Sequence, residues 1–169
     1  MIDLMAIFRA GFVRRWHTSP DLAHTCDRID GHSARVARII LALHPDPSVD
    51  LLRTALIHDD GESVAGDVKA PTKDAFPVIA HALAEMEVQA SVALWGSVAY
   101  DDDPQPHGRE WLKFADRLDA YMWAQHHAPH VMGRDGWPEA REWLEAQAIS
   151  LGCVDAVLPV IGGRRHAAA

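Results

Sequence analysis

The sequence predicts an all-α protein, and three observations support this class. Apolar residues recur at the spacing of a helix along most of the chain. Alternating runs rich in β-branched residues, which indicate strands, are nearly absent. The 169 residues suffice to bury a substantial core, so we expect one domain over residues 1–169. We expect that domain to be a bundle of six to seven helices.

Helix start and stop signals divide the chain into its expected elements. Asp30 or Gly31 could cap the second helix, and Pro45 ends it. Pro138 suits the first turn of the last long helix, and Gly152 ends that helix. Helices are expected over residues 2–13, 32–43, 74–94, 109–125 and 137–151, and a further helix capped by Ser48 or Asp50 is expected to carry His58 and Asp59 at its C-terminal end. Loops are expected over residues 14–29, 60–72 and 97–108, and a linker containing histidines and glycines is expected before Trp137. The apolar tail from residue 156 could dock, and the end over 165–169 is expected to be frayed.

Composition and charge exclude several classes of partner. The formal net charge of −8 argues against broad binding to nucleic acid. No apolar run reaches the roughly eighteen residues of a membrane span, and the first residues lack the pattern of a signal peptide. Cys26 and Cys153 are expected to be reduced thiols. We therefore expect a cytoplasmic protein that binds neither nucleic acid nor membrane.

His58 and Asp59 lie side by side at the end of an apolar run, and Glu62 follows them. Imidazole and carboxylate are ligands that divalent transition metals prefer, and a nearby carboxylate can handle the proton of a metal-bound water. His32 at a helix start and Asp116 on an apolar helix face are further candidate ligands. Each residue alone also has a structural interpretation, because such a histidine often only forms hydrogen bonds and such an aspartate often pairs with arginine.

The order His, His-Asp, Asp on an all-α chain resembles the HD-domain phosphohydrolase superfamily. The resemblance implies a single HD domain with one divalent transition metal, Zn²⁺, Co²⁺ or Mn²⁺. It also implies that Glu62 is the catalytic residue that orients or deprotonates the attacking water. The segment before His32 departs from the Ala-Glu-His pattern common in the family, and residues 17–30 match no recognised pattern. The metal ligands carried over from the family are His32, His58, Asp59 and Asp116.

Further residues look like one branch of that superfamily, the YfbR-like 5′-deoxynucleotidases and the phage DatZ-type dATP triphosphohydrolases. The similarity covers residues 11–121, and the segment 9–17 favours the DatZ type. A triphosphate needs cations in an acidic protein, and Arg15, Lys73 and Lys113 could supply them, although each could equally be a surface cation. Trp16 could pack on sugar or base, or it could lie in the core. The resemblance implies that Asp67 recognises the sugar and that Pro71 excludes an amino group at C2 of the base, whereas the competing interpretations are a helix cap and a turn proline. The implied substrate-binding residues are Arg15, Trp16, Asp67, Pro71, Lys73 and Lys113.

The function that this resemblance implies is hydrolysis of dATP to deoxyadenosine and triphosphate. In the resembling phage enzymes the reaction depletes dATP, so that 2-aminoadenine replaces adenine in the phage genome. Mg²⁺ could accompany the triphosphate, and the reaction would take place in the cytoplasm of the host cell. A homo-oligomer, either a dimer or a hexamer, is expected.

Other functions remain open. A 5′-deoxynucleotidase acting on dNMPs would use nearly the same residues, and only the two lysines favour a triphosphate. A non-catalytic HD-fold module that senses a nucleotide is the alternative from a different class. A cyclic-nucleotide or HD-GYP phosphodiesterase would need additional histidine ligands. The remaining candidate histidines are expected at the surface or in loops: His81, His107, His126, His127 and His130.

Overall fold

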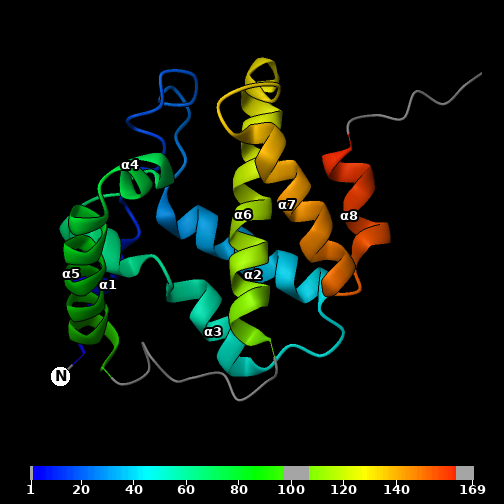
Figure 1. Cartoon of the computed structure of the whole chain (residues 1–169). Coiled ribbons are helices and arrows are strands. Elements are labelled where there is room, and N and C mark those ends of the chain that lie inside the picture. Colours follow the sequence, from blue (N-terminus) through cyan, green and yellow to red (C-terminus); the bar gives the residue numbers. More distant parts are fainter. Residues whose placement is uncertain (1, 97–106, 163–169) are drawn as a thin grey trace, which may run out of the picture. The chain divides into compact units, whose positions relative to one another are not determined.

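The computed structural model describes residues 2–96 and 107–162, and these residues are all-α. Within these two stretches we find eight α-helices and two 3-10 helices but no β-strand, which confirms the predicted class (Figure 1). An isolated antiparallel bridge pairs Arg14 with Arg28. The elements are α1 (Leu4–Ala10), α2 (Ile29–Leu43), α3 (Val49–Ile57), η1 (Asp60–Val64), α4 (Ala70–Ala75), α5 (Pro77–Trp95), α6 (Gly108–His127), η3 (Pro129–Val131), α7 (Trp137–Ser150) and α8 (Val154–Ile161).

The helix predicted over residues 74–94 is interrupted near its start. Pro77 disfavours helical backbone at the residue before it, and Phe76 accordingly has φ −132° and ψ 74°. The chain ends α4 at Ala75 and begins α5 at Pro77, where the missing N–H of proline is tolerated. With α4, and with α8 in the apolar tail, the described residues hold eight α-helices instead of six to seven.

Two elements that carry candidate site residues also differ from the prediction. α2 begins at Ile29, so His32 lies inside its first turn and not at its start. The loop predicted over residues 60–72 contains η1 and the beginning of α4. η1 packs closely on α5, since a Cβ added to Gly61 would lie only 2.4 Å from the backbone oxygen of Glu87.

Periodicity predicts that the first helix turns Leu4, Ile7, Phe8 and Phe12 inward, but the structure does not bury this face. Leu4, Phe8 and Phe12 are 76, 62 and 48% exposed, and Ile7 is half-buried. Ala10 is the buried residue of α1. Periodicity identifies an apolar side of a helix, but it does not show whether another element covers that side.

The chain divides into two compact units, which we describe separately. Unit 1 comprises Met1–Ala34 and Arg53–Asp102, and unit 2 comprises Arg35–Leu52 and Asp103–Ala169. In unit 1, η1 packs on α1 and α5, and α4 packs on α5. In unit 2, α6 packs on α7 and α8, which also contact each other (Figure 1). The expectation of one HD-type domain stays a prediction.

Both units contain buried apolar side chains. Those of unit 1 include Ala10, Leu22, Ile29, Ala55 and Ile57, and those of unit 2 include Val36, Ile40, Leu51, Trp111, Phe114, Leu118, Leu144, Val157 and Ile161. Among the described residues, no helix is both long enough and apolar enough to cross a membrane. The frayed end predicted over residues 165–169 lies outside the described residues.

Candidate metal centre

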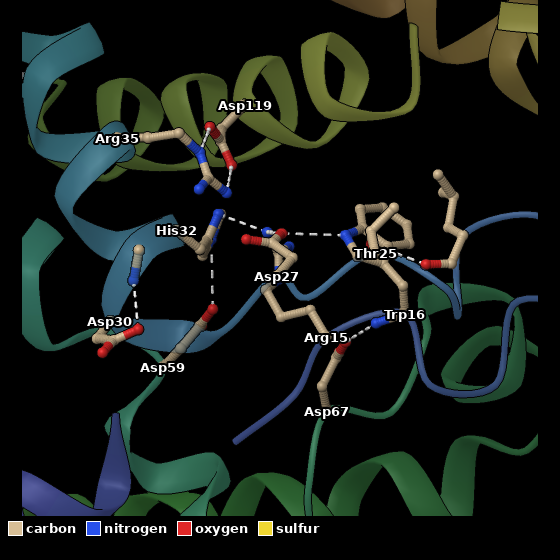
Figure 2. Close-up of polar contacts among 12 residues, drawn as sticks. Arg15, Trp16, Thr25, Asp27, Asp30, His32, Arg35, Asp59, Asp67 and Asp119 are labelled. Atoms are coloured by element: carbon tan, nitrogen blue, oxygen red, sulfur yellow. Dashed lines mark hydrogen bonds and ion pairs between the residues drawn. The ribbon is translucent and has the colours of Figure 1, made fainter. Parts of the chain in front are cut away.

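Three of the predicted metal ligands come together in unit 1. α2 contributes His32 from its first turn, and His58 and Asp59 directly follow the last residue of α3. Nε2 of His32 lies 3.4 Å from one carboxylate oxygen of Asp59 (Figure 2), and Nε2 of His58 lies 3.3 Å from the other. One ligand atom from each of the three residues lies within 4.8 Å of the others. The carboxylate of Asp59 therefore lies between the two imidazoles.

His58 is oriented as metal-binding histidines usually are. Its Nδ1 donates a hydrogen bond to the backbone oxygen of Ala55, 2.9 Å away, which places the ring proton on Nδ1. The lone pair of Nε2 consequently faces Asp59. This nitrogen is buried and has no hydrogen-bond partner among the described residues. Such an atom is costly unless it is satisfied, and a metal ion would satisfy it.

His32 is fully buried, and its second ring nitrogen faces an arginine. The guanidinium of Arg15 contacts Nδ1 of His32, and a guanidinium can only donate hydrogen bonds. In this arrangement the imidazole proton lies on Nε2, on the side of Asp59. A metal can bind Nε2 only if Nε2 loses that proton and Nδ1 takes one up, and Arg15 must then give up its contact with Nδ1. The two histidines thus lie equally close to Asp59 but hold opposite tautomers.

The donor set fits one divalent transition metal. Two imidazoles and a carboxylate are typical ligands of Zn²⁺, Co²⁺ and Mn²⁺, and they do not select sharply among these ions. His32, His58 and Asp59 could therefore hold a metal ion. Asp116, the predicted fourth ligand, is half-buried on α6 in unit 2, and its part in the site stays a prediction.

Glu62 lies on η1 beside this cluster and is 8% exposed. Burial, reinforced by the carboxylates of Asp59 and Asp67, raises the pKa of Glu62 to about 9, although Lys73 opposes the shift. Among the described residues, Oε2 of Glu62 is buried without a hydrogen-bond partner. Acids in such surroundings are typical of functional sites. A cation bound next to Asp59 would counter the repulsion between the carboxylates and lower the pKa of Glu62.

η1 is attached to α5 by a hydrogen bond and by close packing. The indole N–H of Trp95 donates to the carboxylate of Asp60 at 2.8 Å, and burial raises the pKa of Asp60. Gly61 lies against the backbone of Glu87, where a larger residue would not fit. These contacts hold Glu62 in place beside the ligand cluster.

Arg15 and Trp16 lie near the cluster, and Figure 2 shows the contacts that hold them. Trp16 has φ 63°, a left-handed conformation that is uncommon outside glycine. Its backbone N–H donates to Asp67 at 3.2 Å, and its indole N–H donates to Oδ2 of Asp27 at 3.1 Å. The guanidinium of Arg15 lies 3.7 Å from that same oxygen. The structure thus brings together three predicted substrate-binding residues, Arg15, Trp16 and Asp67.

The sequence predictions miss two acidic residues in this region. Asp27 is 2% exposed and lies in the segment 17–30, which matches no recognised pattern. Glu87 lies on α5, and its carboxylate is 3.4 Å from Nζ of Lys73. Neither residue has a local sequence signal, because only tertiary contacts bring each carboxylate to its cationic neighbour.

The other predicted substrate-binding residues lie on α4 and α6. Pro71 is exposed in the first turn of α4, a position in which proline is tolerated, and Lys73 follows it on the same helix. Lys113 is exposed on α6, and its Nζ lies 5.8 Å from the ring centre of Trp143. Arg117 stacks on the same ring at 4.3 Å. Contacts of Pro71, Lys73 and Lys113 with a nucleotide stay predictions.

The remaining histidines lie apart from the candidate metal centre. In the part of the chain that the structure describes, His32, His58 and Asp59 form the group whose geometry could hold a metal ion. His126 and His127 lie at the end of α6 and not in a linker as expected. The five histidines that the sequence places at the surface or in loops are all exposed, namely His81, His107, His126, His127 and His130.

Comparison with known proteins identifies no relative. No protein-family model, curated protein or solved structure matches the chain.

Proposed function

We propose that the protein is a metal-dependent phosphohydrolase of the HD-domain type that hydrolyses dATP to deoxyadenosine and triphosphate. One observation carries this proposal, namely that Glu62 is buried beside a His32–His58–Asp59 cluster that could hold a metal. A metal site without a nearby acid could serve a structural role alone. The added carboxylate supplies a group that can move the proton of an attacking water.

The chemistry divides between the metal and the protein side chains. A bound divalent cation would supply positive charge that acidifies water and polarises the α-phosphate. Glu62 accepts a proton from the water as the water oxygen attacks the α-phosphorus. The bond between that phosphorus and the 5′-oxygen breaks, Glu62 passes its proton to the 5′-oxygen, and deoxyadenosine leaves with a free 5′-hydroxyl. Triphosphate is the second product.

The cationic side chains account for the phosphate end of the substrate. Arg15 lies within contact of His32 and can bind a phosphate oxygen that approaches the metal. Lys73 already lies near Glu87, so binding of a triphosphate would exchange one anionic partner for another. We assign Lys113 to the same role, and Mg²⁺ could accompany the triphosphate. The aromatic ring of Trp16 packs on the sugar or base, and Pro71 faces the C2 edge of adenine.

The proposed biological setting follows from the substrate. Removal of dATP in the cytoplasm of a host cell would favour incorporation of 2-aminoadenine into a phage genome. We propose that the enzyme acts as a homo-oligomer, a dimer or a hexamer. Exposed apolar side chains on α1 and α5, such as Leu4, Phe8, Val78 and Met86, favour burial against another chain.

A panel of nucleotides with identification of products by mass tests the proposal. Wild-type protein loaded with Zn²⁺, Co²⁺ or Mn²⁺ is incubated with each dNTP, each dNMP and 2-amino-dATP. Deoxyadenosine and triphosphate from dATP, with 2-amino-dATP spared, are the expected products. Phosphate released from dNMPs would replace the proposal by a 5′-deoxynucleotidase, which the same metal and acid could serve. A protein that binds metal and nucleotide without turnover would be a sensing module.

A further inference from the structure

A single oxygen of Asp27 lies next to both Arg15 and Trp16, two residues of the proposed nucleotide site. Oδ2 accepts a hydrogen bond from the indole N–H of Trp16 at 3.1 Å, and it lies 3.7 Å from the guanidinium of Arg15 (Figure 2). The side chain of Asp27 is 1% exposed, and that of Arg15 is 10% exposed. A buried carboxylate in such contacts is strongly bound to one orientation, because moving it would leave a charge without compensation.

The backbone reinforces this arrangement from two directions. The N–H of Arg15 donates to the backbone oxygen of Asp27 at 3.1 Å, so the segment around Asp27 runs alongside the segment of Arg15 and Trp16. The N–H of Trp16, in its left-handed conformation, is bound to Asp67 at 3.2 Å. Asp67 therefore fixes the backbone of Trp16, and Asp27 fixes the indole ring by its nitrogen edge. The guanidinium of Arg15 lies over one face of this ring, 5.3 Å from its centre, so a base would stack on the opposite face.

We propose that Asp27 is a positioning residue for nucleotide binding, which orients the indole of Trp16 toward sugar and base while it holds the guanidinium of Arg15 at the site. This inference rests on the proposed function, since it assumes that a nucleotide enters the site. In this assignment Asp27 acts through Arg15 and Trp16 and not on the reacting phosphate. Its loss should therefore weaken nucleotide binding and leave the chemical step nearly unchanged.

The first experiment observes the indole directly in the full-length protein. The N–H resonance of Trp16 is assigned as the signal that Trp16→Phe removes from the spectrum of the six tryptophans. Asp27→Ala should shift this resonance because it removes the acceptor. Addition of dATP to the turnover-deficient Glu62→Gln protein should also shift the resonance. A Trp16 resonance that does not shift on addition of dATP would overturn the inference about Asp27.

The second experiment measures KM and kcat for dATP in three variants. Asp27→Ala should raise KM about tenfold, as expected for loss of a charge-assisted hydrogen bond, with kcat within about twofold. Asp27→Asn keeps an oxygen that can accept the indole N–H, so it should restore most of the affinity. Asp30→Asn is the matched control, because Asp30 is exposed in the same segment and pairs only at the surface with Arg28. Its KM should not change.

A double-mutant cycle guards against an effect on folding alone. If Asp27 acts through the indole, then Asp27→Ala should weaken the binding of dATP less in the Trp16→Phe protein than in wild type. Additive effects, or a folded Asp27→Ala protein with the KM of wild type, would overturn the inference. Turnover of dATP with such an unchanged KM would leave the proposed function intact. A shift of the Trp16 resonance by dATP without any turnover would support the inference and defeat the proposed function.

Discussion

Glu62 in unit 1 and Asp119 in unit 2 are both buried acids, with 8 and 3% of their surface exposed. The carboxylate of Asp119 pairs with Arg35 at 2.6 Å, and that arginine also stacks on Trp123 at 4.3 Å. Glu62 instead lies among other carboxylates, and burial raises its pKa to about 9. An acid with a tight cationic partner stabilises a fold, whereas an acid held in repulsive surroundings costs stability and indicates a functional site. The comparison favours unit 1 as the place of the proposed chemistry.

The largest expected effect is the loss of turnover in Glu62→Gln. Removal of a residue that transfers a proton should lower kcat about 10²- to 10⁴-fold, while the metal ligands remain. Steady-state kinetics and elemental analysis of the same preparation measure the two properties. Glu85→Gln is the control, because Glu85 is exposed on α5. Turnover at the wild-type rate in Glu62→Gln would remove its assigned role.

Asp119→Ala should affect stability and not chemistry. The substitution leaves Arg35 without its partner, but the side chain of Arg35 is 31% exposed and can reach water. We therefore expect a loss of about 2 kcal/mol in the free energy of unfolding, below the full cost of a broken buried pair. Urea denaturation measures it, with the exposed Glu142→Ala as a control near zero. A catalytic defect at unchanged metal content and stability would contradict the comparison.

Gly61→Ala should disturb the position of Glu62 without changing its chemistry. The added Cβ would lie 2.4 Å from the backbone oxygen of Glu87, so η1 must move away from α5. Overpacking of this kind costs about 1–3 kcal/mol, and kcat should fall as Glu62 is displaced. Gly133→Ala is the matched control, because nothing lies within 4 Å of its added Cβ. Equal stability and activity of the two variants would exclude a positioning role for η1.

The last expected effect is a pH dependence of the metal-free protein. The pKa of Glu62 is raised from 4.5 to about 9, so the folded protein retains a proton that the unfolded chain releases between these values. This contribution to stability is present below pH 4.5 and is lost as the pH rises toward 9, by at most about 1.4 kcal/mol per pH unit. Urea denaturation in EDTA should show a steeper loss for wild type than for Glu62→Gln. Parallel curves would contradict the assigned surroundings of Glu62.

Sequence patterns identified what depends on neighbours along the chain. Helical periodicity predicted the all-α class, and the adjacency of His58 and Asp59 required only that they follow the same helix. Asp27 and its contact with Trp16 could not be predicted, because eleven positions and a loop without a recognised pattern separate them. The contact of Arg15 with His32 likewise depends on packing of the chain and not on spacing.

The same limit explains the exposed face of the first helix, but it does not explain the break before α5. The apolar pattern of α1 was correct as a pattern, but Leu4 and Phe8 remain exposed because coverage is a property of the assembled fold. The break at Phe76 could have been predicted, since Pro77 acts on its immediate neighbour. Local rules thus predict where elements begin and end, and tertiary contacts decide which side chains meet.

Metal binding by the intact protein tests the central claim most directly. Equilibrium dialysis against Zn²⁺, Co²⁺ or Mn²⁺, followed by elemental analysis, gives the number of ions bound per chain. We expect one tightly bound ion in wild type and in Glu62→Gln, and none in Asp59→Ala. Failure of wild type to bind any of these ions, or undiminished binding by a folded Asp59→Ala protein, would contradict it.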